Sequence, residues 1–432
     1  MPFPAEKRTE ALNEIIKSGN IIGSRSITYK DKPNTKIDVY EIDLKYLIFN
    51  RYNGRINIDM DTDDADAPAV ESEYDEALEQ KICEYLYNSA ISSNNKTQAD
   101  IDEKGQLEYG IVTADGVIVD GNRRAMILKR LGKNIFRAGI LKDAYTKESG
   151  KAIRELETQL QFDQDAIVDY GPLAKYLTVA KLHDEDRHSF DKISILMGRD
   201  YSKTEVEKMY RTFGTMTDYL DHIETPGIYT LLRIGDKQST KEEGFLQTSH
   251  TKNSMDKGTL ITEKPMEQHK RKYEEMMLDH IRVESVEVPQ DYRLMGVGRD
   301  KSGLLHHEDL FLEMWEKHKI ITEPITQLPE LKEYKEKFPN LATKDLALKK
   351  EEEIKELAQE QLRDLFKEYT GKAKSRAQDD KPERRLERIL AEVKLVNKAQ
   401  DGLADSDNID NITLQVKEIS KRVEDIKRSI GL

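Results

Sequence analysis

One segment constrains the fold more than any other, the stretch "YGIVTADGVIVDGNRRAMILKRLG" at residues 109–132. Two runs of β-branched and small residues flank the turn Ala114-Asp115-Gly116, which predicts an antiparallel β-hairpin. The second run passes through Asp120 and Gly121 directly into a helix predicted over residues 122–131. Gly132 then ends that helix. The chain must therefore fold as strand, turn, strand and helix without an intervening loop.

The junction between this second strand and the helix has the chemistry of an anion site. Gly121 lets backbone NH groups approach a ligand closely, and the start of a helix favours negative charge. Arg123 and Arg124 add two fixed positive charges. We therefore expect a phosphate to bind here. A turn whose arginines make surface salt bridges is the alternative that the motif alone leaves open.

The surrounding sequence divides into an α+β part and a mostly helical part. Before residue 148, helices are predicted at 4–18 and 74–90, and strands at 37–42 and in "IFRAGIL". The acidic stretch 59–75 is predicted to be a solvated loop. After residue 148, helices are predicted at 149–161, 172–184, 188–197 and 203–221. We accordingly predict an α+β fold with domains at residues 1–147, 148–234 and 269–432, and a linker or mobile loop at 235–268.

Two patterns are predicted within the last of these domains. The run "IRVESVEV" at residues 281–288 resembles a strand, and a helix is expected around Trp315. Near the end of the chain, Ile412, Val416, Ile419, Val423, Ile426 and Ile430 repeat at steps of four and three residues, which is a heptad seam. The seam favours self-association, and packing of this helix on its own domain is the alternative.

Charge and hydropathy limit the classes of function. The 432 residues carry 82 acidic and 69 basic side chains, a net charge of −13. This balance excludes a protein that coats nucleic acid by charge alone, so any contact with DNA must come from a local patch. The chain contains no apolar run of membrane-spanning length, and we expect a soluble, cytoplasmic protein with no membrane partner.

A local patch that could contact DNA lies in the second domain. Residues 188–197, a short turn with Gly198, and a helix that opens at Ser202 with Glu205 three residues later resemble a helix-turn-helix with a capping box. The residues that could contact DNA from the second helix are Lys203, Thr204, Lys208 and Arg211. Glu205 and Glu207 alternate with them, so a plain three-helix packing unit is the alternative.

Three features occur in a fixed order that resembles the ParB/sulfiredoxin superfamily. These are "NRYNGRI" at residues 50–56, the hairpin with "VDGNRRAMILKRLG", and the helical region with a helix-turn-helix. The resemblance covers roughly residues 38–222. The family signature Gly-Glu-Arg-Arg, followed by a helix that closes on glycine, corresponds to Gly121 through Gly132. It implies a ParB-like N-terminal domain with a small mixed sheet, followed by mostly α-helical domains.

The resemblance implies a site for a nucleoside triphosphate, CTP or ATP, with Mg²⁺. Gly121, Arg123 and Arg124 would line the phosphates, and Asn122 stands where the family has glutamate. An amide cannot act as a general base, so turnover would be slow or absent unless Asp120 compensates. The residues carried over from the family's early motif, which lies beside the nucleotide, are Asn50, Asn53 and Arg55.

A second family motif, Glu-Asn-x-Gln-Arg, helps to hold the triphosphate and Mg²⁺. The corresponding stretch here is "ELETQLQFDQD", where Glu157, Gln159 and Gln161 are the stand-ins and the arginine is missing. Glu157 is thus the candidate metal ligand and, with Asp120, a candidate catalytic residue.

Together these patterns predict a homodimeric, ParB-like protein in which nucleotide binding at Asp120–Arg124 controls DNA engagement. The alternative is a ParB-like nuclease or NTPase, a CTPase for example, that acts in phage defence or DNA modification with a partner protein held by the C-terminal helices. A regulator with a vestigial cavity is a third interpretation.

Overall fold

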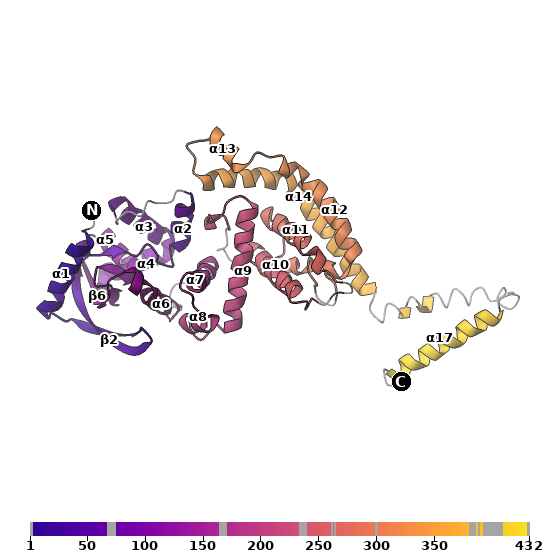
Figure 1. Ribbon diagram of the computed structural model, residues 1–432, viewed down its shortest axis with the longest axis horizontal. Helices are drawn as coiled ribbons and strands as arrows, with labels where there is room; N and C mark the ends of the chain where they lie inside the picture. The colour runs from indigo at the N-terminus through magenta and orange to yellow at the C-terminus, as the bar shows by residue number, and fades with distance from the viewer. Residues whose placement is uncertain are drawn as a thin grey trace.

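The computed structural model describes residues 3–66, 75–163, 171–232, 240–260, 262, 265–298, 301–379, 386–387, 389–391 and 409–429. An N-terminal part built on a β-sheet precedes a part made of helices (Figure 1). The predicted α+β fold is therefore confirmed.

Six strands form one mixed sheet in the order β1-β2-β6-β4-β5-β3. Their bounds are β1 Gly23–Tyr29, β2 Lys32–Asp43, β3 Ile48–Phe49, β4 Gly110–Val112, β5 Val117–Asp120 and β6 Ile135–Ile140. The predicted hairpin is confirmed, since β4 and β5 pair antiparallel. Strand β3 runs parallel to β5, with Ile48 opposite Val117 and Phe49 opposite Ile118. Both strands therefore end at the same edge, which places residues 50–55 beside residues 120–124.

Helices cover this sheet and close the N-terminal core. They are α1 Ala5–Ser18, α2 Asn57–Asp66, α3 Glu76–Asn88, α4 Ile91–Lys104, α5 Asn122–Arg130 and α6 Lys147–Asp163, with a 3₁₀ turn at Leu44–Tyr46. The apolar side of α5 packs through Ala125 and Met126 on Phe49 and Ile118 in one buried cluster. Burial of such side chains is worth about 1.5–3 kcal/mol each and fixes the start of α5 against the strand ends.

The acidic stretch corrects the sequence prediction. Its first half is helix α2 rather than a solvated loop, and residues 67–74 lie outside the described residues. The helix forms because distant cations neutralise its carboxylates: Asp64 pairs with Arg51 at 2.9 Å and Asp61 with Lys181 at 2.5 Å. Met60 of the same helix is buried in the N-terminal apolar core. Residues far apart in the sequence thus changed the outcome of a local charge pattern.

The second part of the chain is helical, and its helices are α7 Pro172–Asp184, α8 Phe190–Met197, α9 Lys203–His222, α10 Thr240–Asp256, α11 Lys270–Arg282, α12 Glu308–Thr326, α13 Leu331–Lys337, α14 Thr343–Asp379 and α17 Ile409–Ser429. Short 3₁₀ helices lie at Tyr229–Leu232, Glu267–His269, Pro289–Leu294 and Leu304–His306. One buried cluster runs from Leu173 on α7 to Ala373 on α14, and it includes Trp315. The helices of both predicted helical domains therefore share one apolar core.

The predicted linker is wrong over half of its length, because residues 240–256 form helix α10. Its buried side is made largely of small and polar residues that hide the helical period. Thr248 donates a hydrogen bond to the Gly244 carbonyl at 2.8 Å, and Phe245 is fully buried. A Cβ on Gly244 would lie 2.6 Å from Ile281, so glycine allows α10 and α11 to approach closely.

The predicted strand at residues 281–288 is also wrong. Helix α11 continues through Arg282, and a 3₁₀ helix begins at Pro289. Val283 and Val286 lie in the segment that connects α11 to this 3₁₀ helix, and both are buried in the helical core. The apolar residues of the run are therefore explained by burial of this connecting segment and not by a strand.

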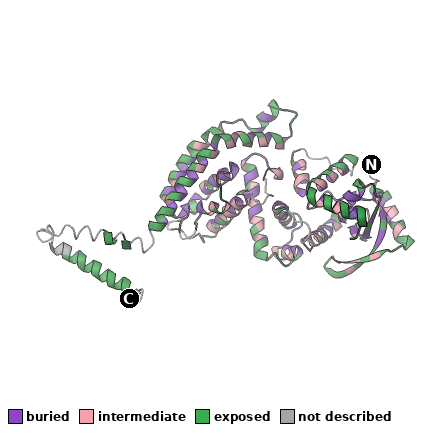
Figure 2. Cartoon of the chain, turned by 180° about the vertical axis from the view of Figure 1, so that it is seen from behind, coloured by how far each residue is buried: buried purple, intermediate pink, exposed green. Residues whose placement is uncertain are grey.

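Helix α17 confirms that the heptad segment is helical, and its described side chains are exposed (Figure 2). Val416, Ile419, Val423 and Ile426 are 40–56% exposed. The Ile412 side chain and Ile430 lie outside what the structure describes. Among the described residues, no helix is both long enough and apolar enough to cross a lipid bilayer.

Candidate functional site

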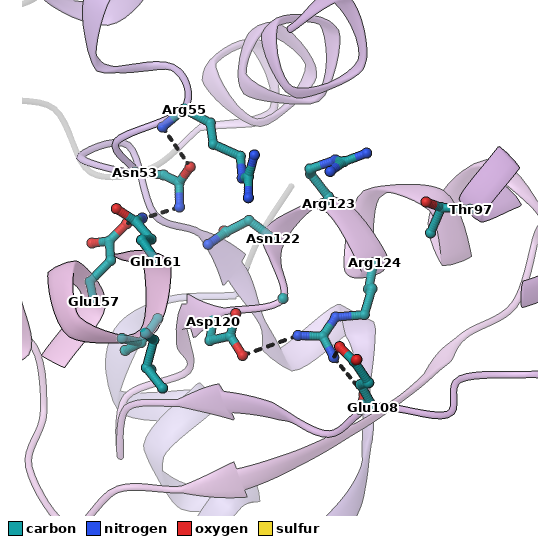
Figure 3. Close-up of a pocket in the computed structure, with 13 residues that line it drawn as sticks. Asn53, Arg55, Thr97, Glu108, Asp120, Asn122, Arg123, Arg124, Glu157 and Gln161 are labelled. Carbon is teal, nitrogen blue, oxygen red and sulfur yellow. Dashed lines mark hydrogen bonds and ion pairs between the residues drawn. The ribbon is translucent and has the colours of Figure 1, made fainter. Parts of the chain in front are cut away.

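A cavity of about 150 Å³ opens at the edge where β3 and β5 end (Figure 3). It is lined by Asn53, Arg55, Thr97, Glu108, Val119, Asp120, Gly121, Asn122, Arg123, Arg124, Glu157, Leu160 and Gln161. Enclosed ligand pockets usually measure about 300–1,000 Å³. A ligand as large as a nucleoside triphosphate would therefore fill this cavity with only part of its structure and extend past its rim.

Gly121 forms the turn at the head of α5. Its φ of +97° lies in the left-handed region, which glycine adopts without strain. A Cβ at this position would lie 2.8 Å from the Phe136 ring and 3.4 Å from the Arg124 guanidinium. Only glycine therefore lets the strand pass into the helix at this edge, as the sequence predicts.

Arg123 carries positive charge in a half-buried place. Its Nε donates to Asn94 Oδ1 at 2.7 Å and its Nη2 to Ser93 Oγ at 3.1 Å, and both partners are neutral. Burial, together with the nearby Arg55 and Arg124 charges, lowers the pKa of Arg123 to about 10. A bound anion would relieve this repulsion, so the arrangement favours negative charge in the cavity.

Arg124 differs from its neighbour because a carboxylate already neutralises it. Its Nη2 lies 3.0 Å from Asp120 Oδ2, and its Nη1 lies 3.3 Å from Glu108 Oε2. Asp120 also pairs with Arg25 at 2.6 Å. Figure 3 shows Arg124 directed toward these carboxylates, whereas Arg123 points away from them. Two guanidinium groups bind the Asp120 side chain, and the general-base role predicted for this residue stays a prediction.

Asn122 lies at the cavity, but its amide serves the fold. Its Oδ1 accepts from the Asn50 backbone NH at 3.1 Å, and its Nδ2 donates to the Ile118 carbonyl at 2.9 Å. The side chain is buried. An amide can donate and accept in this way, which a carboxylate at the same position cannot. Asn122 therefore connects β5 to the segment after β3.

Glu157 is a buried carboxyl that holds three segments together, and it is only 5% exposed. Its oxygens accept from Asn50 Nδ2 at 2.8 Å, Asn53 Nδ2 at 2.9 Å and Gln161 Nε2 at 2.8 Å. The Gly54 backbone NH also donates to it. Burial outweighs these donors and raises the pKa of Glu157 to about 8. Glu157 thus fastens α6 to the turn formed by residues 50–54.

The residues around the cavity do not fit the Mg²⁺ that the resemblance implies. Magnesium takes six oxygen ligands in near-octahedral geometry, commonly one or two carboxylates with waters and phosphates. Four donors already bind the Glu157 carboxyl group, and releasing buried amides would cost about 1–3 kcal/mol each. In the part of the chain that the structure describes, no group of three or more His, Cys, Asp or Glu side chains is arranged to hold a metal ion.

The structure brings most of the predicted site residues together. Asn53, Arg55, Asp120, Gly121, Asn122, Arg123, Arg124, Glu157 and Gln161 line the cavity. Asn50 is not a lining residue, but it donates hydrogen bonds to Asn122 and Glu157, which are. Gln159 is not among the lining residues, because it points about 200° around α6 from Glu157. The helical period of α6 could have identified Leu160 instead.

Sequence reasoning missed the partners that determine the charge of each arginine. Arg25 on β1, Glu108 before β4, and Ser93, Asn94 and Thr97 on α4 carry no local motif. Glu108 and Thr97 line the cavity, whereas Arg25, Ser93 and Asn94 bind residues that line it. Tertiary packing brings all of them there, so no spacing in the sequence signals them.

The predicted helix-turn-helix is present as α8, a turn and α9. The capping box is confirmed, since the Glu205 NH donates to Ser202 Oγ at 3.3 Å and the Ser202 NH donates to Glu205 Oε2 at 2.7 Å. Thr204, Lys208 and Arg211 follow steps of four and three, which puts them on one face of α9.

Ion pairs balance two of the basic residues on this helix. Lys203 pairs with Asp191 at 2.7 Å, and Arg211 lies 3.7 Å from Glu207. Lys208 is exposed. The surface of α9 is thus mixed in charge, and its role in DNA binding stays a prediction.

Comparison with known proteins identifies no family for this chain. No family model matches the sequence, and no curated protein matches it either. A similar solved structure is the crystal structure of the C-terminally truncated chromosome-partitioning protein ParB from Caulobacter crescentus complexed with CTP-gamma-S. Identity is 15% over 49% of this chain and 92% of that one, with a TM-score of 0.16. Because the sequence identity and the TM-score are both low, we base the proposed function on this chain's own residues.

Proposed function

We propose that the cavity binds a nucleoside triphosphate, CTP or ATP, and that binding controls how the helix-turn-helix unit engages DNA. The observation that carries the proposal is the charge at Arg123. A half-buried guanidinium with neutral partners, close to Arg55 and behind a glycine turn, is suited to phosphate oxygens. The choice of nucleotide follows the sequence resemblance and is open to measurement.

Helix α6 provides a physical connection between the cavity and the helix-turn-helix unit. Leu160 and Gln161 line the cavity. The next residue, Phe162, is buried with Ile193 of α8 and Val206 of α9 in a separate apolar cluster. A ligand that shifts the cavity face of α6 would therefore shift the packing of α8. Ligand binding can change DNA engagement only by such a difference between two states.

A second connection joins the sheet to the same unit. Asp31, at the turn between β1 and β2, pairs with Lys192 of α8 at 2.5 Å. Lys192 also lies 3.6 Å from Glu155 of α6. These contacts hold α8 against the N-terminal part, and their loss would free the unit to move.

The proposal includes a homodimer. The exposed apolar residues of α17 repeat at heptad spacing and would pair two chains, with nucleotide binding favouring the closed form. A partner protein could use the same C-terminal helices. Engagement of nucleotide and DNA would place the protein in the cytoplasm.

The alternative of a nuclease or NTPase receives less support from the geometry. Asp120 is held by Arg25 and Arg124, and Glu157 is matched by internal donors. A carboxylate that acts as a general base needs access to the proton it removes. We therefore favour a binding role, with slow hydrolysis as an added property that a phosphate-release assay would detect.

Calorimetric titration of the full chain with CTP, ATP and GTP tests the proposal. We expect one of these nucleotides to bind and the Arg123→Gln variant to bind at least tenfold more weakly. Gel-shift measurements on duplex DNA, with and without that nucleotide, then test the control of DNA binding. Nucleotide affinity that is unchanged in Arg123→Gln would refute the site, and DNA binding that ignores the nucleotide would refute the coupling.

A further inference from the structure

Within the described residues, three carboxylates line the cavity, and each is already engaged by the protein. Glu108 and Asp120 pair with Arg124, and Asp120 also pairs with Arg25. Glu157 accepts from the amides of Asn50, Asn53 and Gln161. Arg123 differs from these groups, because its guanidinium donates to the neutral side chains of Asn94 and Ser93.

We infer that this site, if it binds a nucleotide as proposed above, holds the phosphates directly through Arg123 and Arg55 and without a divalent cation. The ligand class is therefore the free nucleotide, with its full phosphate charge, rather than the magnesium complex. This is a departure from what the sequence resemblance implies.

The first argument concerns the donors around Glu157. To reach a metal, the carboxylate would have to turn away from the Asn50 and Asn53 amides. Those two amides cannot follow it, because Asn50 Oδ1 accepts from the Tyr52 NH at 3.0 Å and Asn53 Oδ1 from the Arg55 NH at 3.1 Å. Both amides would then be buried without an acceptor. The turn that carries Arg55 is thus built around a Glu157 that stays in place.

The second argument concerns charge. Arg55, Arg123 and Arg124 all line one cavity, and their mutual repulsion is already felt at Arg123. A dication placed among them would add to this repulsion, whereas phosphate oxygens would reduce it. Guanidinium groups also match phosphate geometry with two parallel hydrogen bonds. Magnesium would mask the charge that these arginines are arranged to recognise.

Titration of the full chain in EDTA and in excess Mg²⁺, at equal ionic strength, tests the inference with CTP and ATP as probes. We expect binding in EDTA to be equal to, or up to about tenfold tighter than, binding in Mg²⁺. Binding that Mg²⁺ tightens tenfold or more overturns the inference and leaves the proposed nucleotide site intact. If neither nucleotide binds a folded chain in either buffer, the inference and the proposed function both fail.

Two variants make the test specific. Arg123→Gln should weaken binding at least tenfold in EDTA, whereas the matched control Arg130→Gln, at the far end of the same helix, should change it less than twofold. Asp120→Asn removes a carboxylate from the cavity and releases Arg124, so binding in EDTA should stay the same or tighten. If Asp120→Asn weakened nucleotide binding in Mg²⁺ but not in EDTA, Asp120 would be a metal ligand and the inference would be contradicted.

Discussion

The cavity at Gly121 and the surface of α9 both present basic side chains, but the partners of these side chains differ. In the cavity, Arg123 is half-buried with neutral partners, so its charge acts at short range on whatever enters. On α9, Lys203 and Arg211 already pair with acidic neighbours in solvent. Exposed pairs contribute little energy and are screened by salt. We therefore expect strong, localised anion binding at the cavity and weaker, salt-sensitive contact at the helix.

The largest expected effect is a pH dependence of the free energy of unfolding that arises in the cavity and not on α9. Burial raises the Glu157 pKa from 4.5 to about 8, so the folded chain keeps a proton that the unfolded chain has lost. The free energy of unfolding should therefore fall as pH rises from about 4.5 to 8, by at most about 1.4 kcal/mol per pH unit, and level off above pH 8.

Urea unfolding at pH 5, 6, 7 and 8 measures this slope. The Glu157→Gln variant should show a flatter dependence, whereas Glu205→Gln on α9 should leave the fall between pH 5 and 8 in place. Equal slopes in the wild type and Glu157→Gln would show that the cavity carboxyl stays ionised.

Substitution of Arg123 should have the next largest effect. Arg123→Gln removes a charge-assisted contact worth about 1.5–3 kcal/mol, which corresponds to a loss of roughly 10- to 100-fold in nucleotide affinity. Arg124→Gln should cost less, because Asp120 already neutralises Arg124. Calorimetry on both variants compares the two neighbours, and an equal loss in both would contradict the distinction drawn here.

A smaller effect is expected from Gly121→Ala. The left-handed conformation costs a residue with a Cβ about 1–2 kcal/mol, and contact with Phe136 adds strain. Thermal unfolding should show a lower midpoint for the N-terminal part. Gly132→Ala is a matched control, since φ is also positive there but a Cβ would meet nothing within 4 Å. A larger loss at Gly132 would indicate that the close approach to Phe136 is unimportant.

The smallest effect concerns the α9 surface. Lys208→Ala should weaken duplex DNA binding by about 0.5–1 kcal/mol at low salt and reduce the salt-dependence slope by about one. Nucleotide affinity should not change. Gel shifts at several salt concentrations measure the slope, and an unaltered slope would remove Lys208 from the DNA-contacting surface.

The sequence predicts the hairpin, α5 and the capping box of α9 because each depends on neighbouring residues. A turn, a glycine with positive φ and a Ser-x-x-Glu cap are determined within a few positions. Helix α10 was missed because Gly244 and Thr248 on its buried side look polar in a window of sequence. They are buried because α10 packs against α9 and α11 in the tertiary structure.

In the candidate site, too, features determined by neighbouring residues could be predicted, and features determined by distant residues could not. The cavity residues could be identified, but the difference between Arg123 and Arg124 depends on Asp120 and on Arg25, which is 95 positions away from Asp120. Likewise, α2 forms where Lys181, 120 positions away, neutralises Asp61. Charge compensation across such distances follows from the tertiary structure, and local sequence periodicity does not predict it.

The apolar cluster that runs from Leu173 to Ala373 limits how α9 can move. Met216 and Tyr219 of α9 belong to the same buried cluster as Phe311 and Tyr369, which come more than 90 positions later. Any movement of α9 must therefore also disturb the packing of the later helices that share this cluster.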